Sequence, residues 1–306
     1  MDVNDYVVTG IAANGCVRVI GAETTDLVNE ALRIHGTSPV ATAALGRLLT
    51  GAVLLSKQLK NPTDTLTIQI KGRGPLGGVT AVADAAAQVR GYAEHPSADL
   101  PLRKNESSGD GKIADGKLDV SGAIGKGYMN VIKDMGMKEP YIGTVALVSG
   151  EIAEDLTYYL AVSEQIPSVV ALGVQLAPAP EAPCGYCVSK AGGFMLQLLP
   201  GAEEKLISDL EQRVGYITSV TGLLSAGATI VNIAEDLLRG YDFQEQTRSG
   251  CAYRCNCSRE KIARALISIG PEERKEMIEQ DGGAEVHCQF CNQKYLFNAE
   301  ELAGLS

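Results

Sequence analysis

The amino-acid sequence predicts an α+β protein with an N-terminal mixed or antiparallel sheet and helices, a helical linker and a small C-terminal zinc-binding domain. Strand-like runs with period-2 alternation follow one another through short turns in the first half of the chain. A proline-rich segment then interrupts this pattern, and two closely spaced cysteine pairs lie near the C-terminus. We therefore expect three parts: residues 1–183, 184–249 and 250–306.

The first part carries most of the predicted strands and two helices. Ser38, as an N-cap, and Pro39, at the first helical position, predict a helix that runs to about Leu59. A second helix is expected over 152–162. Because consecutive strands with few intervening helices favour an antiparallel or mixed sheet, we expect an α+β core that folds without the rest of the chain. The expected strands are 17–20, 65–70, 78–83, 88–92, 118–124, 128–133 and 141–148.

A boundary and a helical linker are expected in the middle of the chain. Residues 177–183 read Ala-Pro-Ala-Pro-Glu-Ala-Pro, which sustains neither a helix nor a central strand. A long helical segment then opens at Pro200-Gly201, and a second helix is expected over 230–239. Two interpretations stay open: these are surface helices packed on the core, or a movable linker whose apolar face is covered or exposed. The apolar positions of the first segment are Ile207, Leu210, Val214, Ile217 and Leu224.

The last part reads as a compact unit of short elements. Ser258 predicts the N-cap of a helix, Gly270-Pro271 ends that helix and begins another, and Gly282-Gly283 stops the second. Two short strands are expected over 285–288 and 294–297. Asn298, with Glu301 three residues later, is a capping signal for a last short helix.

Four of the eight cysteines form two close pairs, Cys255-Asn-Cys257 and Cys288-Gln-Phe-Cys291, separated by thirty residues. Zinc takes four soft ligands in a tetrahedron, and each short spacing lets a pair bind as a local chelate. His287 is not expected to bind metal, because neighbouring side chains in a strand point to opposite faces. The spacing therefore predicts one zinc ion per chain, held by these four cysteines.

Zinc should dominate the folding of the last part, because its apolar residues are few. Structural zinc binding stabilises such small domains by about 10–16 kcal/mol. Four adjacent thiolates can also oxidise to disulfides, and each disulfide removes two ligands. Oxidation, metal loss and unfolding are therefore expected to be one coupled event.

Several segments closely resemble the redox-regulated 33 kDa heat-shock chaperonin family, the heat shock protein 33 family. In the C-terminal part they are Cys-Asn-Cys-Ser-Arg-Glu-Lys from Cys255, His-Cys-Gln-Phe-Cys from His287, and Tyr-Leu-Phe-Asn-Ala-Glu-Glu-Leu from Tyr295. Residues 36–47, 78–92 and 191–197 look like the family's core and linker, so the resemblance covers the whole chain.

The resemblance implies an ATP-independent holdase, with no enzymatic activity, that is inactive while reduced and zinc-bound. Peroxide or hypochlorite with heat then forms the disulfides Cys255–Cys257 and Cys288–Cys291 and releases zinc. The C-terminal domain and linker unfold, and the exposed apolar surface captures unfolding client proteins, typically as a dimer. The four zinc positions carry over one by one.

The other cysteines leave an alternative open. Cys184, Cys187 and Cys251 are not recognised as family features, and Cys251 could compete within the first pair. Cys184-Gly-Tyr-Cys187 has the spacing of a thiol-disulfide oxidoreductase, but it follows a proline-rich boundary and not a strand-to-helix turn. The roles of these three cysteines and of Cys16 are not predicted.

Charge and motifs argue against other classes. The net charge is −10, and the part from 251 to 306 has seven Lys/Arg against nine Asp/Glu, so no nucleic-acid or membrane surface is expected. The acidic N-terminus lacks a signal segment, and we expect a cytoplasmic protein. The Gly72-Arg-Gly-Pro-Leu-Gly77 segment reads as a hairpin turn and not as a nucleotide site, because another strand follows it.

Overall fold

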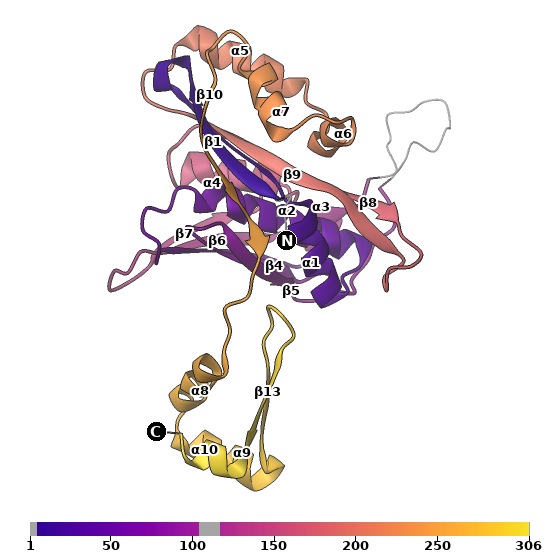
Figure 1. The fold of residues 1–306 in the computed structure, drawn as a ribbon, viewed down its shortest axis with the longest axis vertical. Helices are drawn as coiled ribbons and strands as arrows, with labels where there is room; N and C mark the ends of the chain where they lie inside the picture. The colour runs from indigo at the N-terminus through magenta and orange to yellow at the C-terminus, as the bar shows by residue number, and fades with distance from the viewer. Residues whose placement is uncertain (1–4, 104–116, 306) are drawn as a thin grey trace. The chain divides into compact units, whose positions relative to one another are not determined.

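The structure is a computed structural model that describes residues 5–103 and 117–305. The chain divides after Tyr253 into two compact units, both drawn in Figure 1. Within the described residues, the first unit carries two sheets and most of the helices. The second unit is small and has three helices and one hairpin.

One sheet of the first unit has five antiparallel strands. Strand β9 lies between β2 and β8, and β10, at one edge of the sheet, pairs with β1. The strands in spatial order are β10 (Gln244–Gly250), β1 (Tyr6–Ala12), β2 (Val17–Glu23), β9 (Tyr186–Leu198) and β8 (Ser168–Pro178).

The other sheet has six strands, and all its pairs are antiparallel except that of β11 with β5. The predicted strands at 65–70, 78–83, 88–92, 128–133 and 141–148 are all confirmed in this sheet. In spatial order the strands are β11 (Ala252–Tyr253), β5 (Gln88–Ala93), β4 (Gly78–Asp84), β3 (Thr65–Gly72), β6 (Gly127–Asp134) and β7 (Tyr141–Ala146).

The predicted apolar helix is α2 (Pro39–Ser56), which lies between the two sheets (Figure 1) and contacts strands of both. Its N-cap is confirmed, because the Ser38 hydroxyl accepts a hydrogen bond from the Ala41 amide at 3.2 Å. Its length and composition would suit a membrane span, but 89% of that window is buried inside the fold. It is therefore the core helix, and α1 (Thr25–His35) packs beside it.

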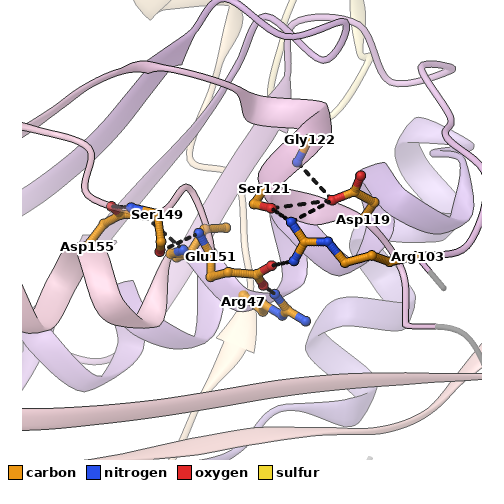
Figure 2. A network of polar contacts seen from close by, with 9 residues as sticks. Arg47, Arg103, Asp119, Ser121, Gly122, Ser149, Glu151 and Asp155 are labelled. Carbon is orange, nitrogen blue, oxygen red and sulfur yellow. Dashed lines mark hydrogen bonds and ion pairs between the residues drawn. The ribbon is translucent and has the colours of Figure 1, made fainter. Parts of the chain in front are cut away.

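Arg47 interrupts the apolar sequence of α2, and Figure 2 shows how its charge is balanced. Its Nη1 atom lies 2.7 Å from Glu151, which also lies 3.5 Å from Arg103. The Arg103 guanidinium in turn donates to the Ser121 hydroxyl at 2.7 Å, and Asp119 caps the short helix α3 (Val120–Ile124). The network ties α2 to α3 and to the segment before α4 (Ala153–Val162).

Three helices cover the other face of the five-stranded sheet: α5 (Glu204–Gly215), α6 (Val220–Ser225) and α7 (Ile230–Leu237). This arrangement confirms the interpretation that the helices pack on the core in the state described. Their buried side chains meet those of the sheet in one apolar cluster, whose helical members are Leu206, Leu210, Val220, Leu224, Ile230, Ile233, Ala234 and Leu237.

The structure corrects three expectations about the first unit. The expected strand over 118–124 contains helix α3, because the Asp119 carboxylate accepts from the Gly122 amide and caps a helical turn. The expected long helix after 200 is two helices, and Ser219 caps the second. The expected linker over 184–249 is helical from Glu204, but it begins with strand β9 and ends with β10.

The proline-rich segment is also placed differently from the expectation. It lies at the turn of the hairpin formed by β8 and β9, so the sheet continues across the expected boundary after residue 183. A fragment that ended near Gln175 would lack β9, the strand that joins β2 to β8. The structure divides the chain after Tyr253 and not after residue 183, so β9 belongs to the same unit as the first part.

The second unit confirms the predicted short elements. Helices α8 (Arg259–Ser268), α9 (Pro271–Asp281) and α10 (Ala299–Ala303) surround the antiparallel hairpin of β12 (Gly283–His287) and β13 (Lys294–Asn298). Ser258 and Asn298 cap α8 and α10 as predicted. Three buried apolar side chains form the core of this unit, Leu266, Phe297 and Leu302, so its apolar core is small.

Candidate metal centre

The structure brings the four predicted cysteines together in the second unit. Cys255 and Cys257 precede α8, and Cys288 and Cys291 lie in the turn between β12 and β13. All four sulfur atoms lie within 4.8 Å of one another. Among the residues that the structure describes, this is the one group of three or more candidate metal-binding side chains.

The distances between the sulfur atoms fit a tetrahedral site. Cys255 and Cys288 lie 3.7 Å apart, and Cys257 and Cys291 lie 3.4 Å apart. A tetrahedron with Zn–S bonds of about 2.3 Å has S–S edges of about 3.8 Å, whereas a disulfide bond measures about 2.05 Å. All four thiols are accordingly free. Four sulfur atoms are soft ligands, and zinc is one of the metals that such ligands bind.

The local sequence explains how the second pair is held. Strands β12 and β13 pair up to His287 and Lys294, so the intervening residues close the hairpin. The Cys288 carbonyl accepts from the amides of Cys291 and Asn292, at 3.3 and 2.8 Å, and Asn292 has a positive φ of 57°. Asparagine tolerates this left-handed conformation, and the tight turn points both thiols to one side.

Arg259 connects the segment that carries the first cysteine pair to the hairpin that carries the second. It is the first residue of α8, directly after the loop that carries Cys257. Its guanidinium donates to the Leu296 carbonyl at 2.8 Å and to Glu301 at 2.7 Å, and it lies 4.2 Å from the centre of the Phe297 ring. Helix α8 is therefore joined to β13 and α10, which fixes the two cysteine pairs relative to each other.

The surroundings shift the pKa values of Cys255, Cys257 and Cys291, and not all in the same direction. Burial raises the pKa of Cys255 to about 11 and also raises the pKa of Cys291. At Cys257 burial raises the pKa, but hydrogen bonds from Tyr295 and from the neighbouring thiols outweigh it, so this pKa lies below its ordinary value. Thiols with raised pKa values are protonated at neutral pH without a cation, so binding a metal ion here must release protons.

His287 is not among the four side chains that the structure groups as candidate metal ligands. Its imidazole pairs with Glu285 and is half exposed. Two other side chains of the centre, Arg259 and Tyr295, were missed by sequence reasoning. The alternation of β13 places Tyr295 on the same strand face as Phe297, and this was the signal available for it.

The remaining cysteines lie in the first unit. Cys251 is fully buried, its thiol donates to the Glu23 carbonyl at 3.7 Å, and burial raises its pKa. A thiol in this position is poorly placed to compete with Cys255. Cys16 is half-buried beside the chain near Gly201.

Cys184 and Cys187 lie in the hairpin of β8 and β9, where Cys187 pairs with Ala177. The structure places no helix start at this hairpin, which would be needed to stabilise a thiolate in a dithiol enzyme. The oxidoreductase alternative is therefore left without structural support.

The glycine-rich segment is a turn, as predicted. The Gly72 amide donates to the Gly77 carbonyl at 2.6 Å, and strands β3 and β4 pair on either side of the segment. The Gly74 amide donates to the Ile124 carbonyl at 2.8 Å. The segment packs against α3 and offers no helix N-terminus to a phosphate group.

Fold and site together define an α+β protein with a separate small unit built around a four-thiol centre. A family model described as Hsp33 protein matches residues 5–298. The chain is 48% identical to the 33 kDa chaperonin of Ruminiclostridium cellulolyticum over 98% of this chain and 97% of that protein. It is 47% identical to the 33 kDa chaperonin of Acetivibrio thermocellus, over 98% and 96% of the two chains.

A solved structure agrees with these relatives. The crystal structure of the 33 kDa chaperonin, a heat shock protein 33 homolog, from Thermotoga maritima matches with a TM-score of 0.84 and 35% identity, over 98% of this chain and 97% of that chain. The chain belongs to the Hsp33 family. These relatives are named chaperonins, which supports a chaperone function for this chain.

Proposed function

We propose that this protein is a redox-regulated, ATP-independent holdase that protects unfolding proteins from aggregation under oxidative and heat stress. In the reduced form, Cys255, Cys257, Cys288 and Cys291 would hold one zinc ion per chain. The observation that carries this proposal is the approach of their sulfur atoms to within 4.8 Å in a unit whose apolar core has three buried members, among the residues described.

A bound zinc ion would supply about 10–16 kcal/mol to the folding of the small unit. The apolar core of the unit is small, since Leu266, Phe297 and Leu302 are its buried members and the other apolar side chains around them are partly exposed. We therefore expect the unit to need the metal to stay folded. Residues 250–306 then form the redox-switch domain, and they unfold when the ligands are lost.

Oxidation removes the metal ligands by converting the four thiols to two disulfides. In each pair, two thiols are oxidised to one disulfide while one peroxide molecule is reduced to two water molecules. The pairs that we propose are those that the family resemblance implies, Cys255–Cys257 and Cys288–Cys291. Sulfur contacts of 3.7 and 3.4 Å join other pairs, Cys255 with Cys288 and Cys257 with Cys291, so a disulfide map of the oxidised protein tests this pairing directly.

The chain between α7 and the small unit offers a route from the switch to the linker. Strand β10 is exposed along its whole length and pairs with β1, and β11 adds two residues to the six-stranded sheet. The Tyr253 hydroxyl anchors β11 by donating to the Gly91 carbonyl at 2.7 Å. Once the small unit unfolds, we expect this segment to fray and to loosen α7.

Helices α5, α6 and α7 would then supply the client surface. They have 12, 6 and 8 residues, and isolated helices shorter than about 12–15 residues are marginal in water. Their packing on the five-stranded sheet is therefore what holds them, and mild heat should release them once the linker of residues 184–249 is loosened. The apolar cluster beneath them becomes a surface for unfolding client proteins.

The remaining parts of the proposal concern partners and location. We propose that the activated protein is a homodimer and needs no nucleotide, nucleic acid or membrane. A cytoplasmic location fits the redox role, because reducing compartments keep the four thiols open until stress.

The test follows zinc release and client aggregation together after peroxide treatment at raised temperature. The proposal predicts that one equivalent of zinc leaves per chain and that suppression of client aggregation appears with it. Suppression by the reduced, zinc-loaded protein at full strength, or complete oxidation with no suppression, would contradict the proposal. Added ATP should change neither result.

A further inference from the structure

A tyrosine hydroxyl contacts one of the four sulfur atoms. Tyr295, in strand β13, donates a hydrogen bond to the Cys257 sulfur at 3.1 Å. Its ring packs against the small apolar core formed by Leu266, Phe297 and Leu302, and this packing restricts the orientation of the ring. Residues 254–305 contain one tyrosine, and it is this one.

We propose that Tyr295 is a positioning residue for the Cys257 thiolate, which tightens metal binding and slows attack of peroxide on that sulfur. This inference depends on the proposed function, since it takes the four cysteines as the metal ligands. The hydroxyl orients the sulfur towards the centre of the tetrahedron and withdraws charge from it.

The geometry favours this role over simple packing. Cys257 lies 3.4 Å from Cys291, and two thiolates at that distance repel each other. A hydroxyl donor on Cys257 lowers the charge on one of them and thereby offsets the repulsion. Partners beyond the ligands that fix ligand orientation typically change metal affinity 10- to 100-fold when removed.

The same hydrogen bond should control oxidation at Cys257. In the first step, the sulfur attacks one peroxide oxygen, the O–O bond breaks, and the leaving hydroxide takes a proton to become water. The sulfenic acid then condenses with a second thiol, with loss of a second water molecule and formation of the disulfide. Because the hydroxyl draws electron density from the attacking lone pair, it slows the first step.

The test uses the full chain with Tyr295→Phe, which keeps the ring and its packing and removes only the hydroxyl. Cobalt(II) in place of zinc reports the sulfur donors through its sulfur-to-metal charge-transfer band. Without the hydrogen bond the sulfur orbitals rise in energy, so this band should shift to longer wavelength. We also expect roughly 10-fold weaker zinc binding in competition with a chelator, and faster zinc release by peroxide.

Tyr216→Phe is the matched control, because that tyrosine is 75% exposed and lies in the first unit. It should leave the cobalt band, the zinc affinity and the release rate unchanged. An unchanged band and unchanged affinity in Tyr295→Phe would overturn the inference, and so would a variant that binds no cobalt, since the ring packing is kept. If the unaltered chain itself binds no zinc or keeps it under peroxide, the proposed function fails instead.

Discussion

The docking of helix α7 on strand β2 can be broken by a single methyl group. Ile230, the first residue of α7, is buried against Gly21 of β2. A Cβ atom added at Gly21 would lie 2.1 Å from Ile230 Cγ2, where ordinary contacts need 3.4–4 Å. Gly21→Ala therefore forces α7 away from the sheet, whereas the four cysteines lie in the other unit and are not altered.

The expected size follows from the cost of overpacking. Inserting a methyl group into a packed site typically costs about 1–3 kcal/mol. If that cost falls on the docked linker alone, the population of the undocked state rises by about 5- to 150-fold. We expect the reduced, zinc-loaded Gly21→Ala protein to hold clients partly without any oxidant, because the proposed switch acts through this same docking.

The assay combines hydrogen exchange with light scattering of an aggregating client. Gly21→Ala should lower protection across residues 230–237 and suppress aggregation in the reduced state. Gly21→Ala/Ile230→Leu is the matched control, since leucine lacks the Cγ2 methyl group and keeps the volume, so the double variant should return towards normal protection. Lost protection without client holding would refute the assignment of the client surface.

Two further changes test the centre and the first unit. Cys288→Ser should abolish tight zinc binding and remove hydrogen-exchange protection from residues 254–305, while Cys187→Ser keeps both; full zinc retention in Cys288→Ser, measured by native mass spectrometry, would show that the ligands are wrongly assigned. Burial raises the pKa of Asp5 to about 6 against an ordinary value of 3.8, so the folded state binds the proton more tightly and the free energy of unfolding should fall as pH rises from about 4 to 6. Asp5→Asn should flatten that dependence in thermal melts taken across this range, and an unchanged slope would contradict it.

Local signals predicted most of the elements. Ser38, Ser258 and Asn298 each cap the helix that they were expected to cap, because a side-chain oxygen and a following amide need only a few residues of sequence. Alternation gave five strands of the six-stranded sheet for the same reason. Residues 118–124 were misread as a strand because Leu118, Val120 and Ile124 fit a period of two, whereas Val120, Ala123 and Ile124 also fit one face of a helix, and the Asp119 cap decides for helix.

Long-range pairing could not be predicted. Strand β9 was read as the start of a linker, since the prolines before it break local structure, yet Pro178 ends an edge strand where a missing amide is tolerated. Gly192 and Gly193 in β9 lie where a Cβ atom would press on Leu224 and Leu172, so they allow close packing on both faces. No local sequence feature indicates that β9 pairs with both β2 and β8.

The four cysteines could be predicted because a metal centre constrains residue type and spacing together. Arg259 and Tyr295 could not, because an arginine or a tyrosine near such a motif is compatible with an exposed position. Their roles follow only from the packing of α8 and β13 around the centre.

Coupling between the thiol centre and the linker helices is tested most directly by hydrogen exchange on the full chain, before and after peroxide treatment at raised temperature. We predict that protection disappears across residues 254–305 and also across 204–237, in step with zinc release and client holding. Strands β3, β4 and β5 should stay protected throughout. A client-holding form in which residues 204–237 kept their protection would contradict this coupling, and the client surface would then have to lie elsewhere.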